Sequence, residues 1–398
     1  MGLKDCQIIF DNPYNTYYVG QTVNGKVEVT LDSPKKIRGI LIKFKGQAGV
    51  QWVIEESKTN NEGKTENERI ELVGDEEYFR IQYYCLGGKD NDAIELPPGK
   101  HIYPFTCVLP PTLPSSFEGQ YGHVRYTVKV ILDRPWKFDH ETKVAFTVLS
   151  PYDLNMNPSL KEPVKITLEK YFCCCWCKSG PLTCVIAIPK SGYVPGEMLP
   201  ILAEVDNISN VDVLNVSFQF QKVVSYHSQF PRRETKKDVH ILERVQVGPV
   251  AARDSKTWNQ NMALPPLPPS NLMNCSIIDL DYELLIEVNV SGFHTNLTSK
   301  IPITIGTVPV IAAPTAPPIS GDNVAVNMDP QHNNTPQLGW VGPQKGRLYP
   351  SIPSESEFGT QSIYDKDDNQ YTRFNSNAQR YSPMYPVYDF SSTQTQQN

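Results

Sequence analysis

The chain has 398 residues, a net charge of −6, 39% hydrophobic residues and nine cysteines, so it is long enough for two ordinary domains and a tail. The negative charge argues against nucleic-acid binding, which needs a cationic surplus, and no apolar run approaches the roughly 20 residues that span a bilayer. Because the N-terminus lacks the apolar region of a signal peptide and the cysteines are odd in number, we expect a cytoplasmic protein with reduced thiols.

Short stretches of alternating apolar and polar residues dominate the first 150 residues. The apolar members of three such stretches are Val27, Val29 and Leu31; Ile40, Ile42 and Phe44; and Val124, Tyr126, Val128 and Val130. A period of two with one polar face is typical of a half-buried antiparallel strand. This alternation predicts that Val128 lies in a core and that Lys129 faces solvent. The charged and Asn-rich stretch from Glu55 to Arg69 is expected to be an exposed loop.

The second half of the chain repeats features of the first half in the same order. Tyr18-Val19-Gly20-Gln21 returns as Tyr193-Val194-Pro195-Gly196-Glu197, and the Leu-Pro-Pro segment at 109–114 returns at 264–269. Proline cannot donate to a strand ladder, so these Leu-Pro-Pro segments belong between strands. We therefore predict an all-β fold with two immunoglobulin-like sandwiches in tandem. Their expected ranges are 1–150 and 164–308, with a linker at 151–163.

The densest cysteine group follows this linker. It comprises Cys173, Cys174, Cys175 and Cys177, with Trp176 between the last two. A structural zinc site needs two spaced clips, and only Cys174-x-x-Cys177 is present. Three interpretations stay open: free thiols on a strand or loop between the domains, which we favour; reversible palmitoylation with peripheral membrane association; and structural zinc. We expect no metal and no other cofactor.

From about Pro309 the chain is rich in Pro, Asn, Gln, Ser and Tyr, which predicts a disordered tail at 309–398 that acts through short motifs. Pro314-Thr315-Ala316-Pro317 matches the P-[ST]-A-P motif that the UEV domain of ESCRT-I binds. The segment Leu348-Tyr349-Pro350-Ser351-Ile352 resembles the LYPx(n)L motif of ALIX-type partners, with Ile352 in place of the usual leucine. Its Tyr349-x-x-Ile352 spacing is also that of a sorting signal.

The sequence shows no recognisable catalytic constellation. It lacks the G-x-S-x-G, P-loop, G-x-G-x-x-G and H-E-x-x-H patterns, and its histidines are scattered. We therefore expect a protein that is not an enzyme. Two basic groups lie in solvated loops on the interpretation that we favour, and the alternative is that they meet phosphorylated peptides or anionic lipid: Lys35-Lys36 with Arg38, and Arg232-Arg233 with Lys236-Lys237.

Three stretches of the first half and two of the second resemble a known family. Residues 96–105, 113–119 and 121–126 resemble the N-terminal domain of the arrestin domain-containing proteins (α-arrestins), and 179–182 with 192–197 resemble the start of their C-terminal domain. The resemblance implies two arrestin-type sandwiches. It also implies an adaptor that links membrane-protein cargo to ubiquitin ligases and endosomal sorting machinery. Such an adaptor would be recruited from the cytoplasm to the plasma membrane and endosomes.

Tails of this family usually carry Pro-Pro-x-Tyr for the WW domains of HECT ubiquitin ligases. The nearest match here is Ser382-Pro383-Met384-Tyr385, which lacks the first proline. Since a WW groove holds a polyproline-type proline and the tyrosine, we expect Pro383 and Tyr385 to form a weakened ligand. The alternative to an adaptor is a non-enzymatic scaffold whose sandwiches bind a stable partner and whose tail is a passive spacer.

Overall fold

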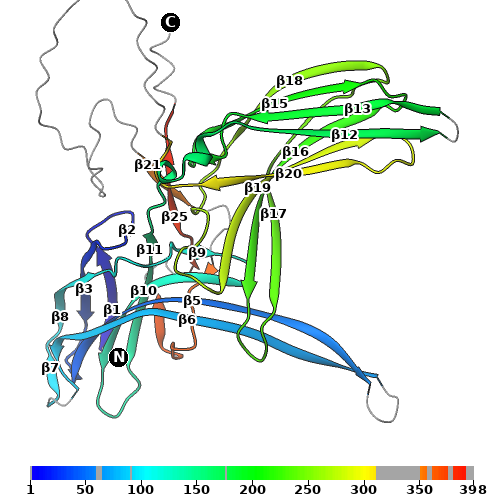
Figure 1. Cartoon of the computed structure of the whole chain (residues 1–398). Helices are drawn as coiled ribbons and strands as arrows, with labels where there is room; N and C mark the ends of the chain where they lie inside the picture. The colour runs from blue at the N-terminus through cyan, green and yellow to red at the C-terminus, as the bar shows by residue number, and fades with distance from the viewer. Residues whose placement is uncertain are drawn as a thin grey trace, which may run out of the picture.

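The computed structural model describes residues 2–59, 65–89, 92–174, 177–310, 350–355, 361–374 and 380–390. Two β-sandwiches follow one another along the chain (Figure 1). Between them lie two short 3-10 helices, η1 (Leu154–Met156) and η2 (Pro158–Lys161). No helix in the described residues is long and apolar enough to cross a membrane. The structure thus confirms the predicted all-β chain with two sandwiches in tandem.

The first sandwich contains the strands β1 to β11. They are β1 (Leu3–Phe10), β2 (Thr16–Tyr18), β3 (Thr22–Leu31), β4 (Lys35–Ile37), β5 (Gly39–Thr59), β6 (Thr65–Gly87), β7 (Ile94–Leu96), β8 (Gly99–Val108), β9 (Phe117–Glu118), β10 (Gly122–Asp133) and β11 (His140–Leu149). A sheet in the order β1-β3-β8 faces a sheet in the order β2-β11-β10-β5-β6. The alternating apolar residues fill the space between these sheets, and Val128 on β10 is fully buried, as predicted.

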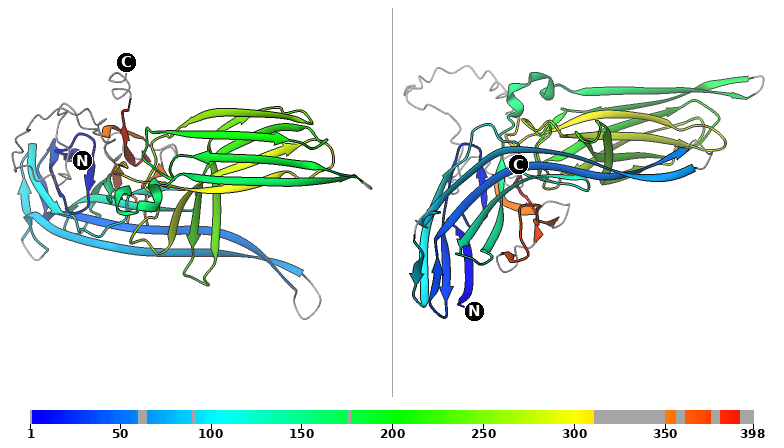
Figure 2. Two further views of the ribbon diagram at one scale, coloured as in Figure 1. Left: turned by 45° about the horizontal axis from the view of Figure 1, so that its top comes forward. Right: turned by 90° about the horizontal axis from the view of Figure 1, so that it is seen from below.

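The stretch from Glu55 to Arg69 is not the loop that we predicted. Its described residues extend β5 and β6 into a long hairpin that projects from the first sandwich (Figures 1 and 2). Glu55 lies opposite Arg69 in this hairpin, and their side chains form an ion pair at 3.0 Å. The charged composition correctly indicates exposure. Backbone pairing between the two strands nevertheless allows charged residues to continue the ladder.

The second sandwich contains the strands β12 to β20. They are β12 (Val164–Cys174), β13 (Cys177–Ile188), β14 (Gly192–Tyr193), β15 (Met198–Asn207), β16 (Val213–His227), β17 (Thr235–Val247), β18 (Asp254–Ala263), β19 (Ile278–Val290) and β20 (Leu297–Ile305). The sheet β12-β13-β15-β18 faces the sheet β14-β20-β19-β16-β17. In β19 every second residue from Ile278 to Val290 is buried, which is the pattern of a strand with one core face.

The internal repeat predicted from sequence has a structural counterpart in two buried tyrosines. Tyr126 on β10 donates its hydroxyl to the carbonyl of Pro114 at 2.6 Å, and Tyr282 on β19 donates its hydroxyl to the carbonyl of Pro268 at 2.8 Å. Each acceptor lies in one of the two Leu-Pro-Pro segments, which run between strands as expected. The same buried hydrogen bond therefore ties a central strand to the preceding proline segment in both domains.

The two sandwiches touch at several places, among them β6 with the segment that follows β16, and Tyr121 with Tyr226 of β16, whose rings lie 5.7 Å apart. Val73 on β6 exchanges backbone hydrogen bonds with Gln229 and Phe230, at 2.8 to 3.0 Å. Glu76 accepts a hydrogen bond from the backbone N–H of Ser276 at 3.2 Å. The base of the long hairpin is therefore a contact point between the domains.

Three stretches of the tail that the structure describes, 350–355, 361–374 and 380–390, contain strands, and part of them packs against the domains. The tail strands are β21 (Pro350–Glu355), β22 (Gln361–Ser362), β23 (Thr372–Phe374), β24 (Arg380–Tyr381) and β25 (Met384–Tyr388). β21 pairs with β25, β22 pairs with β24, and β23 runs parallel to β11 of the first sandwich. One strand of the tail, β23, thus joins an existing sheet, while the other four pair with one another.

Lys129 on β10 shows how the packed tail changes the exposure of a domain residue. It lies on the outer face of its strand, as alternation predicts, yet it is only 4% exposed because the tail covers it. The prediction that Lys129 faces solvent is therefore wrong.

We predict that Val128→Asp lowers the free energy of unfolding of the first domain by about 3 kcal/mol or more, because an unpaired carboxylate would enter the core. Val108→Asp is a matched control, since Val108 lies on β8 of the same sandwich and is 63% exposed. It should cost under about 1 kcal/mol. Chemical denaturation of both variants checks this, and equal losses would mean that the two faces are assigned incorrectly.

Candidate functional site

Four lysines extend from the outer face of the large sheet of the first domain. Lys43 and Lys45 come from β5, Lys129 from β10 and Lys143 from β11. Their neighbours in sequence point into the core, so the strand period places the four ammonium groups on one side. All four side chains are largely removed from solvent. Buried cations require partners of opposite charge. We call these four lysines the lysine face.

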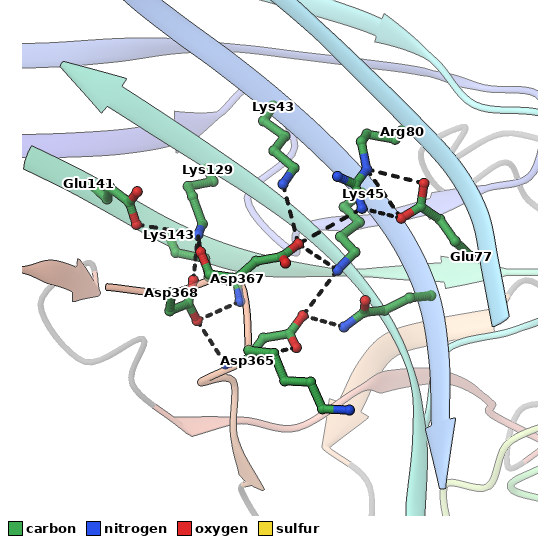
Figure 3. Close-up of polar contacts among 12 residues, drawn as sticks. Lys43, Lys45, Glu77, Arg80, Lys129, Glu141, Lys143, Asp365, Asp367 and Asp368 are labelled. Atoms are coloured by element: carbon green, nitrogen blue, oxygen red, sulfur yellow. Dashed lines mark hydrogen bonds and ion pairs between the residues drawn. The ribbon is translucent and has the colours of Figure 1, made fainter. Parts of the chain in front are cut away.

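The partners come from a turn of the tail, Asp365-Lys366-Asp367-Asp368, which we call the aspartate turn (Figure 3). Asp367 lies 2.9 Å from the Lys45 ammonium and 3.3 Å from that of Lys43. Asp365 lies 3.3 Å from the Lys45 ammonium. The turn therefore places two carboxylates over the two β5 lysines.

Asp368 makes the most enclosed contacts of the aspartate turn. Its carboxylate lies 2.6 Å from the Lys129 ammonium and 2.8 Å from the Lys143 ammonium, and its side chain is fully buried. Glu141 on β11 adds a second carboxylate 3.3 Å from Lys129. Three aspartates and Glu141 thus balance four lysines, which is the condition for holding these charges away from water.

Hydrogen bonds within the aspartate turn fix its shape. The carboxylate of Asp368 accepts the backbone N–H of Asp365 at 2.8 Å, and the Asp368 N–H donates to the Asp365 carbonyl at 2.9 Å. β23 then continues alongside β11, and the Thr372 hydroxyl donates to Glu141 at 2.6 Å. The tail is therefore bound by charge at the turn and by strand addition beyond it.

The ion pairs shift the acidities of both partners. The hydrogen bond from Lys45 lowers the pKa of Asp367. For Asp365, burial raises the pKa, but the Gln47 hydrogen bond and the Lys45 charge outweigh it and the pKa is lowered. Burial lowers the pKa of Lys143, and Asp368 opposes that shift. Since the pKa values of Asp365 and Asp367 are lowered in the docked state, docking through these two groups is strongest above about pH 4 and weakens as the pH falls below it.

The basic groups singled out from sequence lie elsewhere, and an arginine of each is paired within the fold. Arg38 donates two hydrogen bonds to Asp133, at 2.6 and 2.8 Å. Burial lowers the pKa of Lys35 to about 8. Arg232 forms ion pairs with Glu56 and Glu234.

Sequence reasoning missed the lysine face. A usable signal was present, since Lys43, Lys45 and Lys129 occupy the polar positions of alternating strands. The acidic run at 365–368 is the complementary charge in the tail. Matching the strand lysines to this acidic run would have suggested that the tail contacts the first domain.

Most predicted tail motifs fall outside the described residues. This holds for Pro314, Thr315, Ala316 and Pro317, and for Leu348 and Tyr349. Pro350 and Ile352 lie in β21, of which the structure describes the backbone. The ESCRT-I and ALIX-type interactions therefore stay predictions.

Pro383 and Tyr385, the degenerate WW ligand, lie within the described tail and are both buried. Tyr385 is 1% exposed and donates its hydroxyl to the carbonyl of Ser116 at 2.9 Å. A WW domain needs to contact both the proline and the tyrosine. It would reach this segment only after the segment has left the domains.

Cys173, Cys174 and Cys177 of the cysteine group lie at the ends of β12 and β13 that are remote from the first sandwich (Figure 1). Our expectation of a segment between the domains is therefore wrong for its position. Cys174 and Cys177 are opposite each other in the backbone register, next to Cys173. The side chains of Cys173, Cys174, Cys175 and Cys177 are outside the described residues, so acylation stays a prediction. Among the described residues no cluster of His, Cys, Asp and Glu could hold a metal ion.

Comparison with known proteins agrees with this architecture. Residues 6–155 match the model of the arrestin (or S-antigen) N-terminal domain, and residues 178–310 match that of the C-terminal domain. The chain is 34% identical over 325 residues to Arrestin domain-containing protein 17 of Caenorhabditis elegans, covering 78% of this chain and 72% of that protein. It is 30% identical over 311 residues to human Arrestin domain-containing protein 4, covering 77% and 72%. With both domains matched in order, the chain belongs to the family of arrestin domain-containing proteins, the α-arrestins.

Proposed function

We propose that this α-arrestin is a cytoplasmic trafficking adaptor that links membrane-protein cargo to ubiquitin-ligase and endosomal sorting machinery. The lysine face would bind an acidic or phosphorylated segment of the cargo. The observation that carries this proposal is the aspartate turn, which occupies the lysine face with carboxylates of the chain itself. A segment of similar charge from another protein meets the same complementarity.

Family membership supports an adaptor role in general, because arrestin-family proteins act as non-enzymatic adaptors. The finer role rests on the tail motifs and on the lysine face. For the cargo side, the geometry favours an extended peptide over a compact ligand. β11 accepts β23 as an added parallel strand, so backbone hydrogen bonds and charge act together.

The tail carries the motifs that would bind the sorting machinery. Pro314-Thr315-Ala316-Pro317 would bind the UEV domain of ESCRT-I, and the segment from Leu348 to Ile352 would bind an ALIX-type protein. Pro383 and Tyr385 would contact a WW-domain HECT ligase weakly, because one proline of the usual ligand is absent. Recruitment to the plasma membrane and endosomes would follow from these partners, and acylation of the cysteine group would add peripheral membrane association.

A peptide spanning residues 361–374 should compete with the tail for the lysine face. We predict that it binds at least about tenfold more tightly to a full-length variant with Asp365→Asn, Asp367→Asn and Asp368→Asn than to the unmodified chain, because the resident carboxylates no longer neutralise the lysines. Fluorescence anisotropy with a labelled peptide measures this difference.

Two further variants locate the binding. In the background of the three Asp→Asn changes, Lys129→Gln with Lys143→Gln should abolish most of the binding, whereas Lys236→Gln with Lys237→Gln should not. The second pair removes the same charge from a basic group of the other domain. Equal loss from both pairs, or equal binding before and after the aspartate changes, would favour the scaffold with a passive tail.

The proposed interaction with ESCRT-I is tested on the tail motif itself. A peptide from Val310 to Asn323 should bind an isolated UEV domain with a dissociation constant of tens to hundreds of micromolar, or roughly −5 to −6 kcal/mol. Such a short segment buries little area and must be ordered on binding. NMR titration should show that Pro317→Ala removes most of the binding and that Pro318→Ala matters much less. Absence of shifts with the native peptide would remove ESCRT-I from the proposal.

A further inference from the structure

Three tyrosines of the tail place their hydroxyl groups on the domains instead of in solvent. Tyr381 shares a hydrogen bond with the Thr147 hydroxyl at 3.0 Å and donates to the Phe146 carbonyl at 3.1 Å. Tyr385 donates to the Ser116 carbonyl at 2.9 Å. These contacts anchor one part of the segment 380–390 on the first domain.

The third tyrosine lies on the second domain. Tyr388 donates its hydroxyl to the Thr307 carbonyl, and its backbone N–H donates to the Pro195 carbonyl at 2.9 Å. Its ring packs with Leu154 of η1 and Val194. A segment of a few residues therefore bridges the two sandwiches. We call the surface beneath it, formed by Ser116, Phe146, Thr147, Pro195, Gly196 and Thr307, the tyrosine-docking surface.

Gly196 shows that the second domain leaves room for this segment. It has a φ of +90°, and a Cβ on it would lie 2.1 Å from the Tyr388 carbonyl oxygen and 2.9 Å from the Val387 side chain. Gly20 is its counterpart in the internal repeat, with a φ of +77°, and a Cβ there would meet nothing within 4 Å. Both turns need a residue that tolerates positive φ. Of these two glycines, Gly196 alone also needs the missing Cβ for close approach by the tail.

The chemistry of the contact is selective for unmodified tyrosine. A buried hydroxyl that donates to a carbonyl satisfies both groups, and a phosphate in its place would bring charge to a backbone oxygen that can only accept. The rings supply apolar area and the hydroxyls fix the register.

We propose that the tyrosine-docking surface is a binding site for a tyrosine-bearing extended segment, that residues 380–390 of the same chain occupy it, and that this occupancy holds the two sandwiches in one relative position. The contact of Val73 with Phe230 joins the domains at the β6 hairpin. The ring contact of Tyr121 with Tyr226 and the ion pair of Glu56 with Arg232 also cross between the domains. The docked segment adds a connection at a separate place, at Thr307 and Ser116, and a further connection restricts rotation about the others. This inference concerns the fold of the chain and does not depend on the proposed adaptor function.

The test compares Gly196→Ala with Gly20→Ala in the full chain. Both variants place an alanine at positive φ, but only Gly196→Ala obstructs the tail. We expect amide exchange at 380–390 to rise at least about tenfold in Gly196→Ala and to change little in Gly20→Ala. Exchange at the Thr307 amide, and the distribution of interdomain distances in small-angle scattering, should change with it.

A second variant guards against misfolding at Gly196. Tyr388→Phe removes only the hydroxyl and should raise exchange at 380–390 several-fold, whereas Tyr371→Phe, at a tail position that is 43% exposed, should not. Release of the tail with unchanged scattering would overturn the coupling of the domains. Equal effects of the two glycine variants would overturn the docking surface. Protection of 380–390 that depends on protein concentration would assign the site to the tail of a second copy and overturn occupancy by the same chain.

Discussion

The ion pairs between the lysine face and the aspartate turn decide how the first domain meets its tail. A sandwich strand normally leaves its outer face to water, and β19 of the second domain follows that rule with partly exposed residues at alternate positions. Its counterpart β10 does not, because Arg125, Thr127 and Lys129 on its outer face are all buried. Lysines in such a position are stable only while carboxylates neutralise them. The tail supplies three of these carboxylates, so the first domain and the tail form one structural unit.

The two domains therefore share an architecture but differ in how they contact the tail. Both carry the buried tyrosine that bonds to a proline segment, Tyr126 in one and Tyr282 in the other. The sheet of the first domain accepts an added strand and a charged turn, while Gly196 of the second domain accepts the tyrosine segment. A tail that contacts both halves can respond to a partner at either one. For an arrestin-family adaptor, this links the proposed cargo surface to the arrangement of the domains.

The sandwiches could be predicted from sequence because alternation reports which side of a strand faces a core. That is why Val128 is buried as expected. The same alternation cannot report what covers the other side, and the exposure of Lys129 was therefore mispredicted. The packing of the described tail residues could not be predicted for a related reason. Its composition cannot build a core, but Tyr385 and Asp368 need no core of their own, since they bury themselves against surfaces that the domains provide. The charged hairpin at 55–69 likewise depends on backbone pairing, which side-chain composition does not encode.

Amide exchange at residues 361–374 of the full chain, at about 0.1 M and about 1 M salt, tests most directly whether charge holds the tail. Asp368→Asn should raise exchange at least about tenfold at low salt, because it leaves Lys129 and Lys143 without their shared carboxylate. Lys366→Gln is the matched control in the same turn, since Lys366 is 83% exposed and should matter little. High salt should raise exchange in the unmodified chain and add little in Asp368→Asn. Protection that is unaffected by both salt and Asp368→Asn would contradict the account.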